Sequence, residues 1–200
     1  MTDFSPSPLL IVISGPAGVG KDAVVACLKE RGCPFHFVVT ATDRPPRPGE
    51  VHGRDYFFYS TAEFERMERE GELLEHAIVY GQHKGIPKQQ VRQAMASGKD
   101  VVMRLDVQGA ATVRSLAPEA VLIFLYASAE ELLQRMKRRG ADSPEQIALR
   151  SEELAAEMAY LDIFDYVVVN AESRLNCAVD QVLSIIEAEH CRVHPRKVVL

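Results

Sequence analysis

Gly15-Pro16-Ala17-Gly18-Val19-Gly20-Lys21-Asp22 is a glycine-rich stretch between two apolar segments. Residues 9–13 before it predict a buried parallel strand, and residues 23–28 after it predict the first turns of a helix. A glycine-rich turn in this setting is typical of a phosphate-binding P-loop, because its backbone N–H groups point at one centre. The helix N-terminus and Lys21 add positive charge at the same place. The stretch therefore predicts the binding of a nucleoside triphosphate.

One position departs from the usual P-loop pattern. Asp22 stands where a serine or threonine normally supplies a hydroxyl group to Mg²⁺. A carboxylate is also a good Mg²⁺ ligand, although its negative charge faces the phosphates. The order of the glycines differs from the G-x-G-x-x-G of a dinucleotide-binding fold. Asp22 is thus a candidate metal ligand in a nucleotide site.

The composition limits the class of protein. A chain of 200 residues with 47% hydrophobic content can form one core with small inserted lobes. Its net charge of −5 argues against a nucleic-acid-binding surface, which requires a basic face. We see no run of transmembrane length and no signal peptide, and the four cysteines lack a C-x-x-C pair or metal-ligand spacing. We expect a cytoplasmic protein with reduced thiols and no membrane or nucleic-acid partner.

Strands and helices alternate along most of the chain. The further apolar runs that predict strands are residues 35–39, 101–106, 121–126 and 166–170. The capping boxes that predict helix starts are Ser60-x-x-Glu63, Ser128-x-x-Glu131 and Ser143-x-x-Gln146, and residues 175–189 predict the last helix. Five strands alternating with helices predict an α/β fold, the three-layer core of a P-loop NTPase with a five-stranded parallel sheet. Residues 41–91 mix short strands with one helix and predict an inserted α+β lobe.

Two sets of arginines are candidates for phosphate contacts. Prolines hold Arg44 and Arg47 along a stiff, extended segment, although Pro45-x-x-Pro48 also fits a proline-rich ligand. Such ligands usually lie in disordered tails, so this alternative is less favoured. In the second set, Arg135 and Arg139 share one helix face, and Arg150 lies on the next helix; surface ion pairing is the alternative there.

The order and spacing of several motifs resemble those of guanylate kinase along nearly the whole chain. These motifs are Gly15 to Lys21, Arg44-Pro-Pro-Arg-Pro-Gly-Glu50, Asp55-Tyr56, Gly71-Glu-Leu-Leu-Glu75, Asp106-Val-Gln-Gly109, Arg139-Gly140, Asp142-Ser143 and Val168-Val-Asn170. The resemblance implies transfer of a phosphoryl group from ATP to GMP or dGMP. It also implies a core (1–40, 92–133 and 158–190), a GMP-binding lobe (41–91), a helical lid (134–157) and a C-terminal tail (191–200).

The resemblance also implies roles for individual residues. ATP would contact Gly15, Pro16, Ala17, Gly18, Val19, Gly20, Lys21, Asp22, Ala23 and Asn170. GMP would contact Thr40, Arg44, Arg47, Tyr56, Glu75, Lys84 and Asp106. Lys21, Arg135, Arg139 and Arg150 would surround the transferred phosphoryl group, and Asp22 and Asp106 would hold Mg²⁺, in part through water. Glu75 would accept hydrogen bonds from guanine N1–H and the exocyclic amine, a donor pair that adenine lacks.

Four positions differ from the family pattern and keep alternatives open. Lys84 replaces a tyrosine, Ile86 replaces a serine or threonine that contacts guanine O6, and Arg104 stands where some relatives are acidic. Asp22 is the fourth, and ribose 1,5-bisphosphate phosphokinases can carry it, although they lack the arginine–proline segment and Glu75. Non-catalytic guanylate-kinase-like binding domains typically have degraded P-loops, whereas Lys21 is intact here. A monomer and a homo-oligomer are equally compatible with the sequence.

Overall fold

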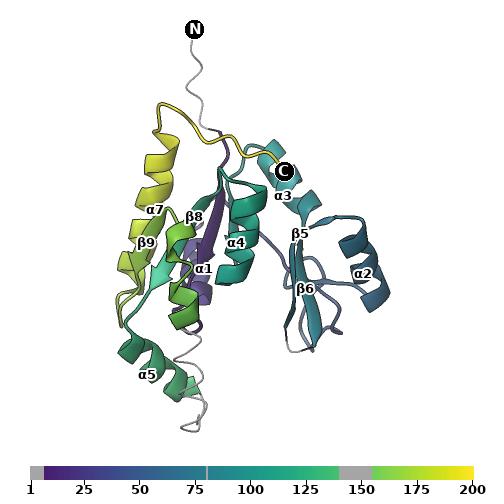
Figure 1. Ribbon diagram of the computed structural model, residues 1–200, viewed down its shortest axis with the longest axis horizontal. Helices are drawn as coiled ribbons and strands as arrows, with labels where there is room; N and C mark the ends of the chain where they lie inside the picture. The colour runs from purple at the N-terminus through teal and green to yellow at the C-terminus, as the bar shows by residue number, and fades with distance from the viewer. Residues whose placement is uncertain (1–6, 80, 140–154) are drawn as a thin grey trace.

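The computed structural model describes residues 7–79, 81–139 and 155–200. Five strands form a parallel sheet in the order β2-β7-β1-β8-β9 (Figure 1). Their bounds are β1 Leu10–Ser14, β2 His36–Phe37, β7 Val101–Arg104, β8 Val121–Tyr126 and β9 Tyr166–Val169. The predicted five-stranded parallel sheet is therefore confirmed, although the second strand is shorter than the apolar run at 35–39.

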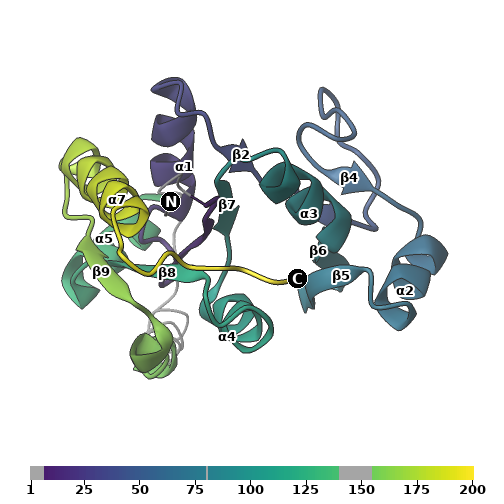
Figure 2. The same cartoon turned by 90° about the horizontal axis from the view of Figure 1, so that it is seen from above.

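Helices cover both faces of this sheet, as Figure 2 shows. Their bounds are α1 Lys21–Glu30, α3 Lys88–Ala96, α4 Val107–Leu116 and α7 Leu175–His190. A further helix, α5 Ala129–Arg139, lies beyond the carboxyl ends of the strands (Figure 1). Because successive strand residues point to opposite faces, Ile11 and Ile13 pack in the core beneath α1 and α7. Leu10 and Val12 pack in a second core with residues of α3 and α4. These two apolar cores are the reason that the molecule has three layers.

A second, four-stranded sheet lies beside the parallel sheet (Figure 1). Its order is β4-β3-β6-β5, with bounds β3 Ala41–Thr42, β4 Phe57–Phe58, β5 Leu73–Val79 and β6 Gln82–Pro87. Helix α2 (Thr61–Arg69) begins at the predicted capping box of Ser60 and Glu63, and Phe64 and Met67 pack on this sheet. The predicted mixture of short strands and one helix is observed here.

One helix and one strand end differ from the sequence-based expectation. Helix α3 was not predicted: it follows Pro87 directly and has no side-chain cap. Strand β7 ends at Arg104 and not at residue 106. Asp106 caps helix α4 instead, by accepting a hydrogen bond from Gly109 N–H at 2.7 Å. The capping box of Ser128 and Glu131 is present. The predicted box at Ser143 lies outside the described residues.

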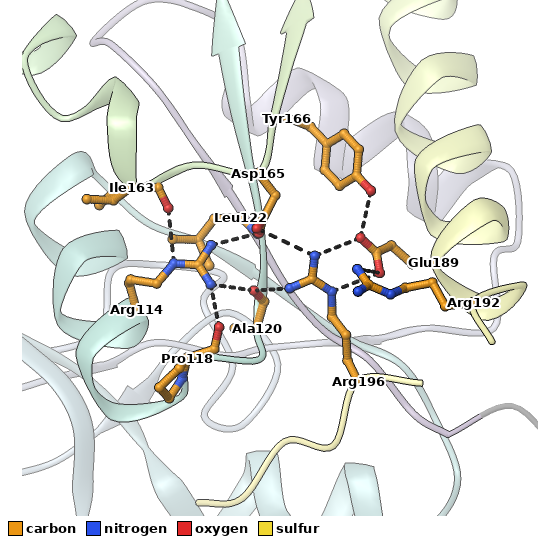
Figure 3. Close-up of polar contacts among 10 residues, drawn as sticks. All are labelled: Arg114, Pro118, Ala120, Leu122, Ile163, Asp165, Tyr166, Glu189, Arg192 and Arg196. Carbon is orange, nitrogen blue, oxygen red and sulfur yellow. Dashed lines mark hydrogen bonds and ion pairs between the residues drawn. The ribbon is translucent and has the colours of Figure 1, made fainter. Parts of the chain in front are cut away.

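The C-terminal segment packs on the chain's own core, a placement that the sequence did not predict. Arg196 is 8% exposed and donates to both carboxylate oxygens of Glu189 at 2.8 Å (Figure 3). Glu189 also accepts a hydrogen bond from the Tyr166 hydroxyl at 2.6 Å. Farther along, Val198 and Leu200 pack against the core beneath α3 and α4. The tail thus crosses the edge of the sheet opposite the P-loop.

Of the helices in the described parts of the chain, none has the length and apolar character needed to cross a membrane. No disulfide joins any of the four cysteines.

Candidate active site

The P-loop joins β1 to α1 at the carboxyl edge of the parallel sheet. Gly15 has φ +133°, and a Cβ there would lie 2.3 Å from the Leu125 carbonyl oxygen. Gly20 has φ +99°, and a Cβ there would lie 2.5 Å from Asn170 Nδ2. Both positions therefore require glycine for backbone conformation as well as for space.

Lys21 points back over the loop. Its Nζ donates to the carbonyl oxygens of Gly15 at 2.5 Å and Pro16 at 3.1 Å. Burial lowers the pKa of Lys21, whereas the carboxylates of Glu157 and Asp106 act in the opposite direction. The ammonium group thus lies at the centre of the loop, with carboxylates nearby that favour its charged form.

Asn170, which directly follows β9, and Arg135 of α5 brace the P-loop. Asn170 is 4% exposed, and its Nδ2 donates to Val19 O at 2.7 Å. Arg135 donates to Val19 O at 3.2 Å and to Asn170 O at 2.7 Å. Next to this contact is a cavity of about 490 Å³. It is lined by Gly18, Gly20, Ala23, Arg135, Asn170, Ala171, Glu172, Ser173 and Leu175.

A second cavity, of about 210 Å³, lies between the P-loop and the small sheet. It is lined by Lys21, Thr40, Glu75, Ala77, Lys84, Ile86, Arg104, Leu105 and Asp106. Five residues predicted to contact nucleotide are therefore brought together here from five different segments. Ile86 is 2% exposed and offers this cavity no hydrogen-bonding side chain.

Glu75 is the half-buried carboxylate of this cavity. Burial raises the pKa of Glu75 to about 7, and the Asp106 carboxylate adds to the rise. Glu75 packs closely against the first turn of α4 because residue 109 is a glycine. A Cβ on Gly109 would lie 3.3 Å from both Cγ and Cδ of Glu75. The same Cβ would lie 3.3 Å from Asp106 Oδ1. Gly109 therefore sets the positions of two acidic groups.

We expect Gly109→Ala to raise KM for the acceptor nucleotide about tenfold with a smaller change in kcat. The added methyl group pushes the Glu75 carboxylate away by a few tenths of an ångström, because the packed strand β5 that carries Glu75 cannot shift with it. Steady-state kinetics with varied acceptor nucleotide checks this, and thermal melting verifies that the variant is folded. An unchanged KM in Gly109→Ala would contradict the expected contact.

The proline-rich segment holds Arg44 by an ion pair that the sequence did not reveal. The two terminal nitrogens of the Arg44 guanidinium donate to the carboxylate oxygens of Glu50 at 2.7 and 2.6 Å. The guanidinium also lies over the rings of Tyr56, at 4.9 Å, and Phe58, at 5.5 Å. The Arg44 hydrogen bonds and the backbone N–H of Arg47 lower the pKa of Glu50 to about 2. Glu50 thereby orients Arg44.

The remaining predicted residues are placed as follows. Arg47 is exposed, and neither it nor Arg44 is among the residues that line the two cavities described above. Tyr56 lines a neighbouring cavity of about 250 Å³ that shares Thr40, Ile86 and Arg104 with the cavity that Glu75 lines. The side chain of Arg139 and all of Arg150 lie outside the described residues.

Two of the unusual residues contact each other. Asp22, in the first turn of α1, forms an ion pair with Arg104, the last residue of β7. The positions are 82 residues apart, and the sequence gave no reason to pair them.

The carboxylates suit a metal ion that arrives with a nucleotide. Asp22 and Asp106 both lie at the carboxyl edge of the sheet, beside Lys21, and their oxygens are the ligand type that Mg²⁺ prefers. Within the part of the chain that is described, no three His, Cys, Asp or Glu residues form a group that could hold a metal alone. A Mg²⁺ ion held by one or two carboxylates and by phosphate oxygens fits this donor set.

The parallel sheet, the P-loop with its lysine and the two flanking cavities define a P-loop phosphotransferase. A family model described as guanylate kinase matches residues 7–189, and the chain belongs to that family.

Individual relatives agree with this family. Guanylate kinase 2, chloroplastic/mitochondrial, of rice is 51% identical over 195 residues, covering 96% of this chain and 68% of that protein. Guanylate kinase of Nocardia farcinica is 44% identical over 195 residues, covering 96% of this chain and all (100%) of that protein. The crystal structure of guanylate kinase from Anaplasma phagocytophilum superposes with a TM-score of 0.73 at 28% identity, covering 94% of this chain and 89% of that one.

Proposed function

We propose that this protein transfers the γ-phosphoryl group of ATP to GMP or dGMP, forming GDP or dGDP. The observation that carries the proposal is the half-buried Glu75 carboxylate in a cavity that also contains Lys21 of the P-loop. A carboxylate that would read the base and a lysine that would bind phosphate line one cavity, which would bring an acceptor nucleotide next to the donor phosphates. Family membership supports the same reaction.

On the donor side, the P-loop N–H groups and Lys21 would bind the ATP phosphates. The cavity beside Asn170 and Arg135 would hold the adenosine, because it opens directly next to Gly18 and Gly20. Mg²⁺, when bound with ATP, would neutralise phosphate charge, with Asp22 and Asp106 as its protein ligands. Arg135 would reach the transferred group by leaving Val19 O, to which it donates in this structure.

On the acceptor side, Glu75 would accept hydrogen bonds from guanine N1–H and the exocyclic amine. Thr40 would donate to O6, and Lys84 would contact the phosphate from β6, both from the wall of the cavity. Arg44, Arg47 and Tyr56 would bind the same phosphate after the lobe (41–91) approaches the core. The lid (134–157) would close over the donor and bring Arg139 and Arg150 with it, which excludes water from the reaction.

We expect GMP binding to weaken as the pH falls below 7. Both guanine groups are donors, so Glu75 must be ionised to accept from them, and its pKa is raised to about 7 by burial and by Asp106. Well below that pH, each further unit lowers the ionised fraction about tenfold, and the Kd rises in proportion. Because the GMP phosphate also titrates near pH 6, guanosine, which has no phosphate, is the control ligand. A guanosine Kd that is constant from pH 5.5 to 8 would contradict the expectation.

The reaction is tested by measuring ADP release from ATP and Mg²⁺ with GMP, dGMP, AMP, UMP and ribose 1,5-bisphosphate in parallel. Strong turnover with GMP and little with AMP is the expected result. Turnover with ribose 1,5-bisphosphate alone would identify the protein as a ribose 1,5-bisphosphate phosphokinase. ATP binding without turnover on any acceptor would favour a non-catalytic binding domain.

A further inference from the structure

The ion pair of Asp22 and Arg104 lies at the point where donor and acceptor sites meet. Asp22 follows Lys21 directly and projects from the first turn of α1, with 76% of its side chain exposed. Arg104 ends β7, next to β1 in the sheet, and lines the acceptor cavity together with Lys21. The pair therefore lies next to Lys21 of the P-loop.

An aspartate at this P-loop position has an electrostatic cost. A hydroxyl group there is neutral, whereas the carboxylate of Asp22 places a negative charge beside the anionic phosphates of the donor. When the nucleotide arrives with Mg²⁺ bound, the metal ion offsets the negative charge of Asp22. Before the metal arrives, the cation in contact with Asp22 is the guanidinium of Arg104.

We propose that Arg104 is a positioning residue for donor binding that acts through Asp22. It neutralises the Asp22 carboxylate and holds it toward β7 until Mg²⁺ takes over as the counter-ion. Asp22 and Arg104 together then replace the neutral hydroxyl group of an ordinary P-loop. This inference rests on the proposed binding of ATP, and it specifies how that binding depends on the metal.

The experiment is a set of ATP titrations by calorimetry, each made with excess Mg²⁺ and with EDTA. The variants are Arg104→Met, Arg104→Lys, Asp22→Ser and the double variant Asp22→Ser with Arg104→Met. Arg31→Met is the matched control, because it also removes an arginine from an ion pair with an aspartate, Asp180, at the other end of α1. Thermal melting of each variant verifies that it is folded.

We expect Arg104→Met to weaken metal-free ATP binding at least tenfold and Mg²⁺–ATP binding less than threefold. Arg104→Lys keeps the charge and should stay near wild type in both conditions. In the double variant, metal-free binding should return to within threefold of wild type, because the charge that Arg104 neutralises is gone. Arg31→Met should change neither affinity.

Three results would overturn the inference while leaving the proposed function intact. An equal loss with Mg²⁺ and with EDTA, or a loss that persists in the double variant, would mean that Arg104 contacts the phosphates itself. No change in Arg104→Met would mean that the pair has no part in donor binding. If the wild-type chain bound no ATP in either condition, the proposed function would fail, and this inference with it.

Discussion

Glu75→Gln is expected to lower kcat/KM for GMP by roughly 10³- to 10⁴-fold. The glutamine has nearly the same shape but turns one acceptor oxygen into a donor, which then faces a donor of guanine. The remaining amide oxygen is also a weaker acceptor than a carboxylate. Because the group is half-buried beside Asp106, water does not easily replace the lost hydrogen bonds.

Steady-state kinetics with GMP and AMP measures this effect. The matched control is Glu65→Gln, the same change at an exposed position of α2, which should leave both rates unchanged. Turnover with AMP starts low and should fall little in Glu75→Gln, so selectivity for guanine should be lost. A fall of less than tenfold with GMP would show that another group reads the base.

Arg196→Met is expected to destabilise the fold by about 3–5 kcal/mol, the typical effect of breaking a buried ion pair. Methionine retains much of the packing of the side chain but leaves the Glu189 carboxylate, which is 2% exposed, without its bidentate partner (Figure 3). The Tyr166 hydroxyl and Arg192 still contact that carboxylate, so the loss should not exceed this range. Urea unfolding at neutral pH measures the difference in free energy.

Two further variants separate charge burial from other causes. Glu189→Leu combined with Arg196→Met removes both charges and should recover most of the lost stability, because replacing a buried pair by apolar groups is often nearly neutral. Arg31→Met breaks an exposed pair with Asp180 and should cost less than about 1 kcal/mol. If the double variant were as unstable as Arg196→Met, lost packing would be the cause instead.

The pair of Glu189 and Arg196 lies at the edge of the sheet opposite the P-loop, where the tail crosses from α7 toward α3 (Figure 1). Its loss should therefore lower the midpoint of unfolding without changing kcat/KM for GMP at a temperature where the variant is folded. The same tail also receives a hydrogen bond from Arg92 of α3, whose Nε donates to Leu200 O at 3.2 Å.

Much of the fold could be predicted because its signals are local. The apolar runs that became β1, β7, β8 and β9 have the length of buried strands, and the capping boxes at Ser60 and Ser128 mark helix starts within four residues. The P-loop is also a local motif, whose glycines and lysine are contiguous. Helix α3 was missed because it has no such local signal: it starts at Lys88, directly after Pro87, without a side-chain cap.

Candidate residues of the site could be named from the sequence, but the contacts among them could not. Glu75 was identified from a family motif, whereas its contact with Gly109 depends on how α4 packs against β5. Asp22 and Arg104 were each recognised as unusual, yet only the adjacency of β7 and β1 brings them together across 82 residues.

The burial of Arg196 in the C-terminal tail could not be predicted either, for a general physical reason. A polar residue in an irregular segment has no periodic pattern, so the sequence cannot tell whether it is buried, exposed or paired. Arg196 is buried because the tail turns back after α7 and meets a glutamate that faces the core. Hydrophobic spacing and caps act over a few residues and therefore specify the elements, whereas ion pairs between distant residues exist only once those elements have packed.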